Sequence, residues 1–153
     1  MPTPPVIHDL YAAAERIKPF AIQTPLLESP HINEICGGRI LIKAEPLQRT
    51  GSFKFRGAFN TLSQLGDEAV PGGVVAYSSG NHAQGVAAAA ELLGLPAVIV
   101  MPADAPKIKV ANTKSYGAEV VTYDRYCESR EDIGAAISAE RGAVLIKPYD
   151  DTR

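Results

Sequence analysis

One lysine, Lys54, has an unusual setting for a charged side chain. Phe53 and Phe55 flank it, and Arg56 follows. A helix is predicted to begin near Ser52, which can serve as its N-cap, so the lysine would lie in the first turn, where the helix dipole disfavours a cation. Apolar surroundings and nearby positive charge both favour the neutral amine, the form that attacks a carbonyl group. Most lysines are solvated charges, and these properties alone name no cofactor.

A second candidate is the loop formed by Ser78, Ser79, Gly80 and Asn81, which follows an apolar run and precedes an alanine-rich segment. We expect it where a parallel strand passes into a helix, at the ligand-binding edge of an open α/β sheet. Unpaired N–H groups at the start of that helix, together with its dipole, would attract an anion such as a substrate carboxylate. The alternative is structural, with Ser79 or Asn81 capping the helix.

Other chemistries find less support in the same residues. The chain has no GxGxxG for a dinucleotide and no GxxxxGK[ST] for a P-loop. Residues 76–80 resemble the GxSxG turn of serine hydrolases, with alanine in place of the first glycine. The only later histidine is His82, which adjoins the loop, so a hydrolase would need a base from outside this sequence. Cys36 and Cys127 lie far apart without a CxxC, and no metal site or disulfide framework is predicted.

Apolar and helical segments alternate from residue 74 onward. The expected strands are 74–78, 96–101, 118–123 and 143–147, and the expected helices between them are 82–93, 105–116 and 128–140, ended by glycines at 94, 117 and 142. Such alternation predicts βαβ units, and therefore an α/β fold with an open parallel sheet flanked by helices.

The first third of the chain is less regular. A helix is predicted over 9–17, a strand over 39–44, a helix from Ser52 to about Leu65, and a polar turn over 66–73. The lysine would thus lie on a helix that precedes the regular part of the sheet.

Composition excludes several classes of protein. Fifteen Lys and Arg residues stand against 17 Asp and Glu residues without a basic cluster, so no nucleic-acid partner is expected. Apolar stretches such as 86–90 and 97–101 are too short to cross a membrane, and the first residues do not read as a signal peptide. We expect a soluble, cytoplasmic protein with one ordinary hydrophobic core among its 153 residues.

Together, the two chemically interesting segments resemble a known signature. Residues 52–58 (SFKFRGA), followed by 78–85 (SSGNHAQG), are similar to the paired motifs of fold-type II pyridoxal-phosphate (PLP) enzymes. Phe55, where related branches usually have Asp, and His82 after Asn81 match the branch of threonine dehydratase, serine dehydratase and serine racemase. Shorter matches occur at 24–26 (TPL), 43–45 (KAE), 101–102 (MP), 116–118 (YGA) and 148–151 (PYDD).

The resemblance implies roles for the residues that match. Lys54 would bind PLP covalently and act as the base at the substrate Cα, Phe53 would pack beside the cofactor ring, and Asn81 would hydrogen-bond its phenolic oxygen. The carboxylate-binding loop is matched by Ser78, Ser79, Gly80 and His82. Ser79 also matches the hydroxyl that moves a proton on the face opposite the lysine in racemases.

Four further residues have structural explanations. Gln84 and Gly85 would pack the helix start on the sheet, and Arg56 would pair with a carboxylate. Tyr116 would be structural, although nucleotide-binding members of the branch have a tyrosine at a matching place.

The resemblance also implies a domain division and an activity. Residues 1–46 would be the N-terminal portion of a large PLP domain, 47–147 a small α/β domain carrying Lys54 and the carboxylate-binding loop, and 148–153 the start of the return to the large domain. The implied activity is dehydration and deamination of L-threonine or L-serine to a 2-oxo acid and ammonia, by a homodimer. Serine racemisation is one alternative, and a catalytically inactive ligand-binding or dimerising α/β module is another.

Overall fold

A parallel sheet forms the centre of the protein in the computed structural model, which describes residues 4–66, 71–149 and 151. Its strands are β3 (Val74–Tyr77), β4 (Ala97–Pro102), β5 (Glu119–Tyr123) and β6 (Val144–Ile146). They run in the order β5-β4-β3-β6, and every pair is parallel. The predicted α/β fold with an open parallel sheet is therefore confirmed.

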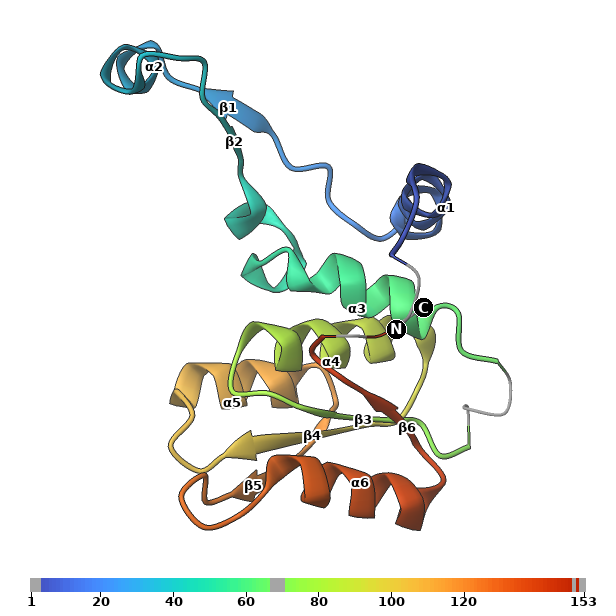
Figure 1. Ribbon diagram of the computed structural model, residues 1–153. Helices are drawn as coiled ribbons and strands as arrows, with labels where there is room; N and C mark the ends of the chain where they lie inside the picture. The colour runs from blue at the N-terminus through green and yellow to red at the C-terminus, as the bar shows by residue number, and fades with distance from the viewer. Residues whose placement is uncertain (1–3, 67–70, 150, 152–153) are drawn as a thin grey trace.

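Helices cover both faces of this sheet (Figure 1). Helices α4 (Asn81–Leu93) and α5 (Lys107–Ser115) lie on one face, and α6 (Arg130–Arg141) lies on the other. Side chains of β4 alternate accordingly: Ile99 is in the same apolar cluster as residues of α4, whereas Val98 and Val100 are in a second cluster with residues of α6. Double coverage explains why β4 is apolar throughout.

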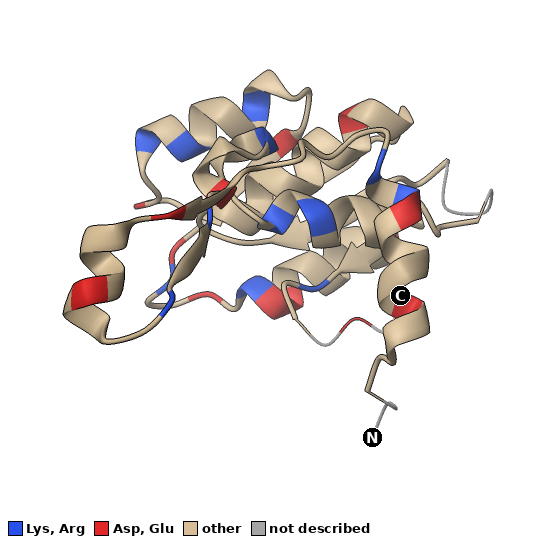
Figure 2. Ribbon diagram, turned by 90° about the horizontal axis from the view of Figure 1, so that it is seen from above, with Lys and Arg blue, Asp and Glu red and all other residues tan. Residues whose placement is uncertain are grey.

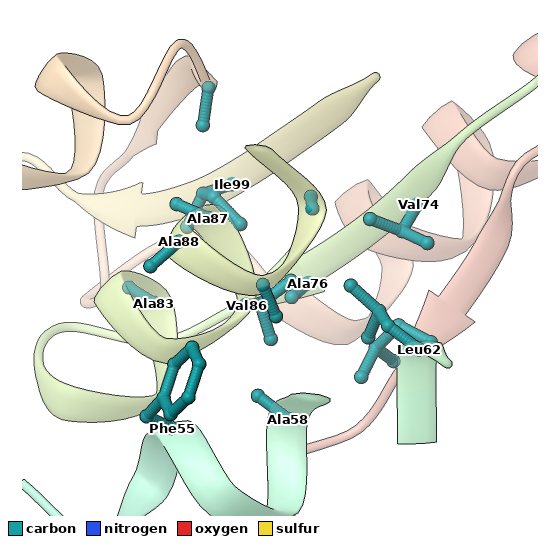
Figure 3. Close-up of a cluster of buried hydrophobic side chains, with 14 of the residues drawn as sticks. Phe55, Ala58, Leu62, Val74, Ala76, Ala83, Val86, Ala87, Ala88 and Ile99 are labelled. Carbon is teal, nitrogen blue, oxygen red and sulfur yellow. The ribbon is translucent and has the colours of Figure 1, made fainter. Parts of the chain in front are cut away.

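A third layer is formed by α3 (Lys54–Leu62), which packs mainly on α4 (Figure 1). Figure 3 shows Phe55 and Ala58 of α3 facing Ala83 and Val86 of α4, whereas Leu62 lies nearer Val74 of β3. Because α4 lies between α3 and the sheet, every residue from 82 to 90 is buried. Its run of alanines provides the small, apolar surface that a helix packed on several sides requires.

Residues 4–53 form an arm that contains α1 (Ile7–Ile17), the short antiparallel strands β1 (Leu26–Glu28) and β2 (Leu41–Lys43), α2 (Pro30–Cys36), and the 3₁₀ turns η1 (Glu45–Leu47) and η2 (Arg49–Gly51). In this arm β1, α2 and β2 project from the body, whereas α1 lies beside α3 (Figure 1). The two α-helices, the two strands and the turns contain no buried residue in the described structure. Their exposed apolar side chains include Ile7, Leu10, Tyr11, Leu26, Leu27, Ile35, Leu41 and Ile42.

Most of the predicted elements are confirmed to within two residues, and the helix-ending glycines Gly94 and Gly142 have the expected left-handed backbone. The N-cap prediction for Ser52 is wrong, because α3 begins at Lys54 after Phe53, and the Ser52 hydroxyl is buried without a hydrogen-bond partner in the described structure. The same helix ends at Leu62, before the predicted Leu65. β1 and α2 were not predicted.

Two predictions fall partly outside the described residues. Within the turn expected over 66–73, residues 67–70 are not described, and within the return segment 148–153, residues 150, 152 and 153 are not described. Charged residues of both signs are interspersed over the described ribbon (Figure 2). None of the helices in the described ranges is long and apolar enough to span a membrane.

Candidate active site

Lys54 lies at the edge of a cleft of about 270 Å³ between the start of α3, the start of α4 and the segment after β6. The lining includes Phe53, Lys54, His82, Lys147, Pro148 and Tyr149. The Lys54 ammonium group donates a hydrogen bond of 3.3 Å to the carbonyl oxygen of Pro148 and lies 5.5 Å from the centroid of the Phe53 ring. The lysine is thus held at the cleft by one polar contact and one aromatic contact, and neither of them buries it.

The two phenylalanines that flank this lysine have different environments. Phe55 is fully buried against α4, whereas Phe53 is 59% exposed and lines the cleft. Helical geometry explains the difference, since neighbouring positions on one turn point in different directions. Of the two phenylalanines, Phe53 is therefore the one that offers a ring surface to a ligand near the Lys54 amine.

Arg56 pairs with a carboxylate, as its structural explanation predicted. Its guanidinium group donates two hydrogen bonds to Glu45, of 2.9 and 2.7 Å, and the Thr24 hydroxyl donates a third to the same carboxylate at 2.6 Å. The paired guanidinium lowers the pKa of Glu45 below its ordinary value. The Glu45 carboxylate thus offsets the charge of Arg56, so Arg56 adds less positive charge near Lys54 than the sequence suggested.

His82 is another polar side chain that lines the cleft. It is only 8% exposed, and its Nε2 atom lies 3.4 Å from the carbonyl oxygen of Ile146. Burial lowers the pKa of His82, and the nearby charge of Lys54 adds to this effect. At pH 7 the imidazole is therefore mostly in its neutral form, which can donate one hydrogen bond and accept another.

The loop before α4 leaves its own polar groups available. Helix α4 begins at Asn81 with Gly80 as its N-cap, and no side chain in the described structure caps it. The structural alternative, in which Ser79 or Asn81 caps the helix, is therefore wrong. The Ser78 hydroxyl accepts a hydrogen bond of 3.2 Å from the Gly80 backbone, while Ser79 is exposed.

Gly85 brings α4 directly against the backbone of the lysine. A methyl group placed on Gly85 would lie 3.2 Å from the carbonyl carbon and oxygen of Lys54 and 3.3 Å from the Phe55 nitrogen. A packing role for Gly85 is thus confirmed, although the neighbour is α3 and not the sheet. The close approach places the Lys54 backbone within one helical turn of the loop at residues 78–81, because Asn81 and Gly85 are four residues apart on α4.

Two residues of α5 that the sequence reasoning missed contact the start of α4. The Lys109 ammonium group donates a hydrogen bond of 2.9 Å to the Asn81 side-chain oxygen. The Asn112 side chain donates a bond of 3.0 Å to the oxygen of Gln84, which is 1% exposed. Lys109 and Asn112 are three residues apart on α5, as Asn81 and Gln84 are on α4. This spacing could have suggested that Lys109 and Asn112 share one face of α5, but it could not show that α4 lies against that face.

The cleft suits a cofactor that carries an aldehyde on a flat aromatic ring. The Lys54 amine can react with an aldehyde, and the exposed Phe53 ring can pack against a flat group. The lining of this cleft includes His82 but not Ser78, Ser79, Gly80 or Asn81. Outside the lining, Asn81 and the uncapped α4 N-terminus offer hydrogen-bond donors to negatively charged oxygens. Within the described residues there is no cluster of three or more His, Cys, Asp or Glu side chains that could hold a metal ion. Tyr116 lies away from this cleft and packs against the main apolar cluster.

Comparisons with known proteins agree with this chemistry. The family model described as "Pyridoxal-phosphate dependent enzyme" matches residues 17–153. An L-threo-3-hydroxyaspartate ammonia-lyase of Pseudomonas sp is 55% identical over 143 residues, which are 94% of this chain and 45% of that protein. The structure of maize serine racemase superimposes with a TM-score of 0.90 and 44% identity, over 95% of this chain and 44% of the racemase.

The processed form of threonine deaminase isoform 2 from Solanum lycopersicum also has a similar structure, with a TM-score of 0.81 and 34% identity over 99% of this chain and 43% of the deaminase. The chain thus spans less than half the length of each of these three proteins.

Proposed function

Because this chain belongs to the pyridoxal-phosphate dependent enzymes, as its family match over residues 17–153 shows, we propose that it acts in a lyase that dehydrates and deaminates β-hydroxy amino acids. L-Threonine and L-serine are the proposed substrates, and the products are a 2-oxo acid and ammonia. The names of similar proteins support this class, since hydroxyaspartate, serine and threonine all carry a hydroxyl group at Cβ. Hydroxyaspartate is therefore the third substrate to assay.

The observation that carries the proposal is the position of Lys54, whose amine lies at a cleft beside Phe53 and the neutral His82. We propose that Lys54 holds the cofactor, that Phe53 packs beside its ring, and that Asn81 donates a hydrogen bond to its phenolic oxygen. When bound, PLP supplies an electron sink that makes the substrate Cα–H bond acidic.

The residues of the α4 start have the complementary task of holding the substrate. The carboxylate would be bound by backbone N–H groups and side chains of Ser78, Ser79, Gly80 and His82, favoured by the helix dipole. Lys54, released when the substrate amine takes its place on the cofactor, would then accept the Cα proton. As the Cβ–O bond breaks, the hydroxyl group would leave as water together with that proton, and hydrolysis of the unsaturated product would give the 2-oxo acid and ammonia.

We also propose the domain division and the homodimer that the resemblance implies. The exposed apolar side chains of α1, β1 and β2 support the assignment of residues 1–46 to a larger domain, because such side chains normally pack in a core or an interface. Residues 47–147 would be the small domain, and 148–153 would lead back to the large one.

The test of the cofactor assignment is covalent labelling. The protein is incubated with PLP, reduced with borohydride, and digested so that the labelled lysine is identified by mass spectrometry. We expect the label on Lys54, with loss of the visible absorption band in Lys54→Ala. Lys147→Ala is the matched control, because Lys147 lines the same cleft. A label on Lys147, or none on any lysine, would overturn the proposal.

Serine racemisation is the second candidate, favoured by Ser79, whose side chain is exposed and caps no helix. If Ser79 moves the proton on the face opposite Lys54, Ser79→Ala should abolish racemisation of serine and affect elimination from L-serine less. Chiral chromatography beside a 2-oxo acid assay separates the two reactions. Equal loss of both would show that Ser79 serves in carboxylate binding instead.

A further inference from the structure

Helix α5 contacts the start of α4 through two parallel side-chain pairs. Lys109 donates to Asn81 at 2.9 Å, and Asn112 donates to Gln84 at 3.0 Å. Residues 109 and 112 are one turn apart on α5, as 81 and 84 are on α4, and the helices lie side by side (Figure 1). Gln84 is almost fully buried, so the Asn112–Gln84 pair fixes the rotation of α5 against α4. This orientation places Lys109 over Asn81, the first residue of α4.

The Lys109 contact determines which way the Asn81 amide points. An ammonium group only donates hydrogen bonds, so it can bind only the oxygen of the amide. The amide nitrogen, with its two N–H donors, is then directed away from α5. An ammonium group bound to the oxygen also withdraws electron density from the amide, which makes the N–H groups better donors to an anion.

We propose that Lys109 is a positioning residue for the cofactor: it locks the Asn81 side chain in the orientation that presents N–H donors to an anionic oxygen of PLP. The inference rests on the proposed function, in which Asn81 binds the phenolic oxygen. Without Lys109, the amide can rotate by half a turn and present its oxygen, which an anionic partner repels. The loss therefore weakens cofactor binding without touching the Lys54 amine.

The lock itself is tested by NMR on the cofactor-free protein. The side-chain amide signals of Asn81 are assigned by their absence from Asn81→Asp and are then compared in Lys109→Met and Lys109→Arg. We expect a clear shift in Lys109→Met and near-native signals in Lys109→Arg, which keeps a cationic donor. The control is Lys114→Met, an exposed lysine on the same helix whose side chain makes no hydrogen bond in the described structure. Unchanged Asn81 signals in Lys109→Met would overturn the inference.

The consequence for the cofactor is tested by titrating each protein with PLP and following the visible band. Loss of one charge-assisted but partly exposed contact should weaken binding about fivefold in Lys109→Met, with binding restored in Lys109→Arg and unchanged in Lys114→Met. Native affinity in Lys109→Met, or equal weakening in both lysine-to-methionine variants, would refute a role toward the cofactor. If the unsubstituted protein forms no lysine-bound PLP, the proposed function fails and this inference falls with it, even if the NMR result is positive.

Discussion

The contact between α3 and α4 at Gly85 permits a quantitative prediction for Gly85→Ala. A β-carbon at this position would lie 3.2 Å from two backbone atoms of Lys54 and 3.3 Å from one of Phe55, so α3 would have to move outward by a few tenths of an ångström. Replacing glycine by alanine inside a helix stabilises by about 1 kcal/mol, whereas overpacking a close interface costs about 1–3 kcal/mol. We expect a net destabilisation of about 1 kcal/mol.

Gly57→Ala is the matched control, because Gly57 lies inside α3 and a β-carbon there would meet nothing within 4 Å. That variant keeps the propensity gain without the contact, so it should stabilise by about 0.5–1 kcal/mol. Urea unfolding followed by circular dichroism measures both variants, and their difference isolates the packing cost. If Gly85→Ala stabilised the protein as much as Gly57→Ala does, the described packing of the Lys54 backbone on α4 would be refuted.

Three further predictions concern the charged groups of the site. Lys54→Ala should abolish the visible band with PLP. It should change the urea midpoint little, because the only hydrogen bond of the Lys54 side chain within the described residues is the 3.3 Å contact with Pro148. A large loss of stability would contradict this. Glu45→Gln should cost about 1–2 kcal/mol at pH 7. Since Arg56 lowers the pKa of Glu45 below 4.5, this contribution is fully present well above pH 4.5 and is lost as the pH falls from there through the lowered pKa of the folded state. Urea unfolding should therefore show a difference between the two proteins that is full at pH 7 and shrinks as the pH falls below 4.5. Burial lowers the pKa of His82 below 6.5, so an NMR titration of the folded protein should show a midpoint below that pH, and a midpoint above 6.5 would contradict this. The contribution of His82 to the free energy of unfolding should decline as the pH falls below 6.5, because the unfolded chain takes up the proton first.

The part of the fold that could be predicted from the sequence is the part with strong local signals. Strands such as β4 are apolar throughout, and α4 and α6 end at glycines, Gly94 and Gly142, that adopt a left-handed backbone. These signals are independent of distant contacts. The three-residue strand β1, which was not predicted, carries no comparable pattern, because all of its residues are exposed in the described structure.

One missed helix had signals that could have revealed it. Ser29 caps α2, Pro30 occupies its first turn, and Gly37 ends it in a left-handed conformation, which is the usual arrangement of helix-boundary residues. The helix is only seven residues long and buries nothing, so its apolar spacing gave no support to these boundary signals.

The sequence pointed to candidate site residues, whose roles stay predictions, but it could not give their contacts. Motifs identified Lys54 and the loop before α4 as the reactive segments, and the structure brings Lys54 and His82 to one cleft. Sequence could not show that Asn81 leaves α4 uncapped and accepts a hydrogen bond from Lys109. Side-chain pairs between helices depend on how the helices are rotated and offset against each other, and tertiary packing determines both.

The position of the reactive lysine depends on contacts that lie on both sides of the expected boundary near residue 46. On one side, Gly85 holds the Lys54 backbone against α4. On the other, Arg56 connects the same turn of α3 to Glu45 and, at 3.2 Å, to the carbonyl oxygen of Ile22.

Gln48 strengthens the second connection, because its side chain donates to and accepts from the Ile22 backbone at 2.7 and 2.9 Å while being almost fully buried. A movement of the arm would therefore act on the first turn of α3 through Arg56, while Gly85 holds the same turn against α4. Because Lys54 and the loop before α4 both belong to the proposed small domain, the Arg56–Glu45 pair would connect the arm to the site without changing the distance between the Lys54 backbone and that loop.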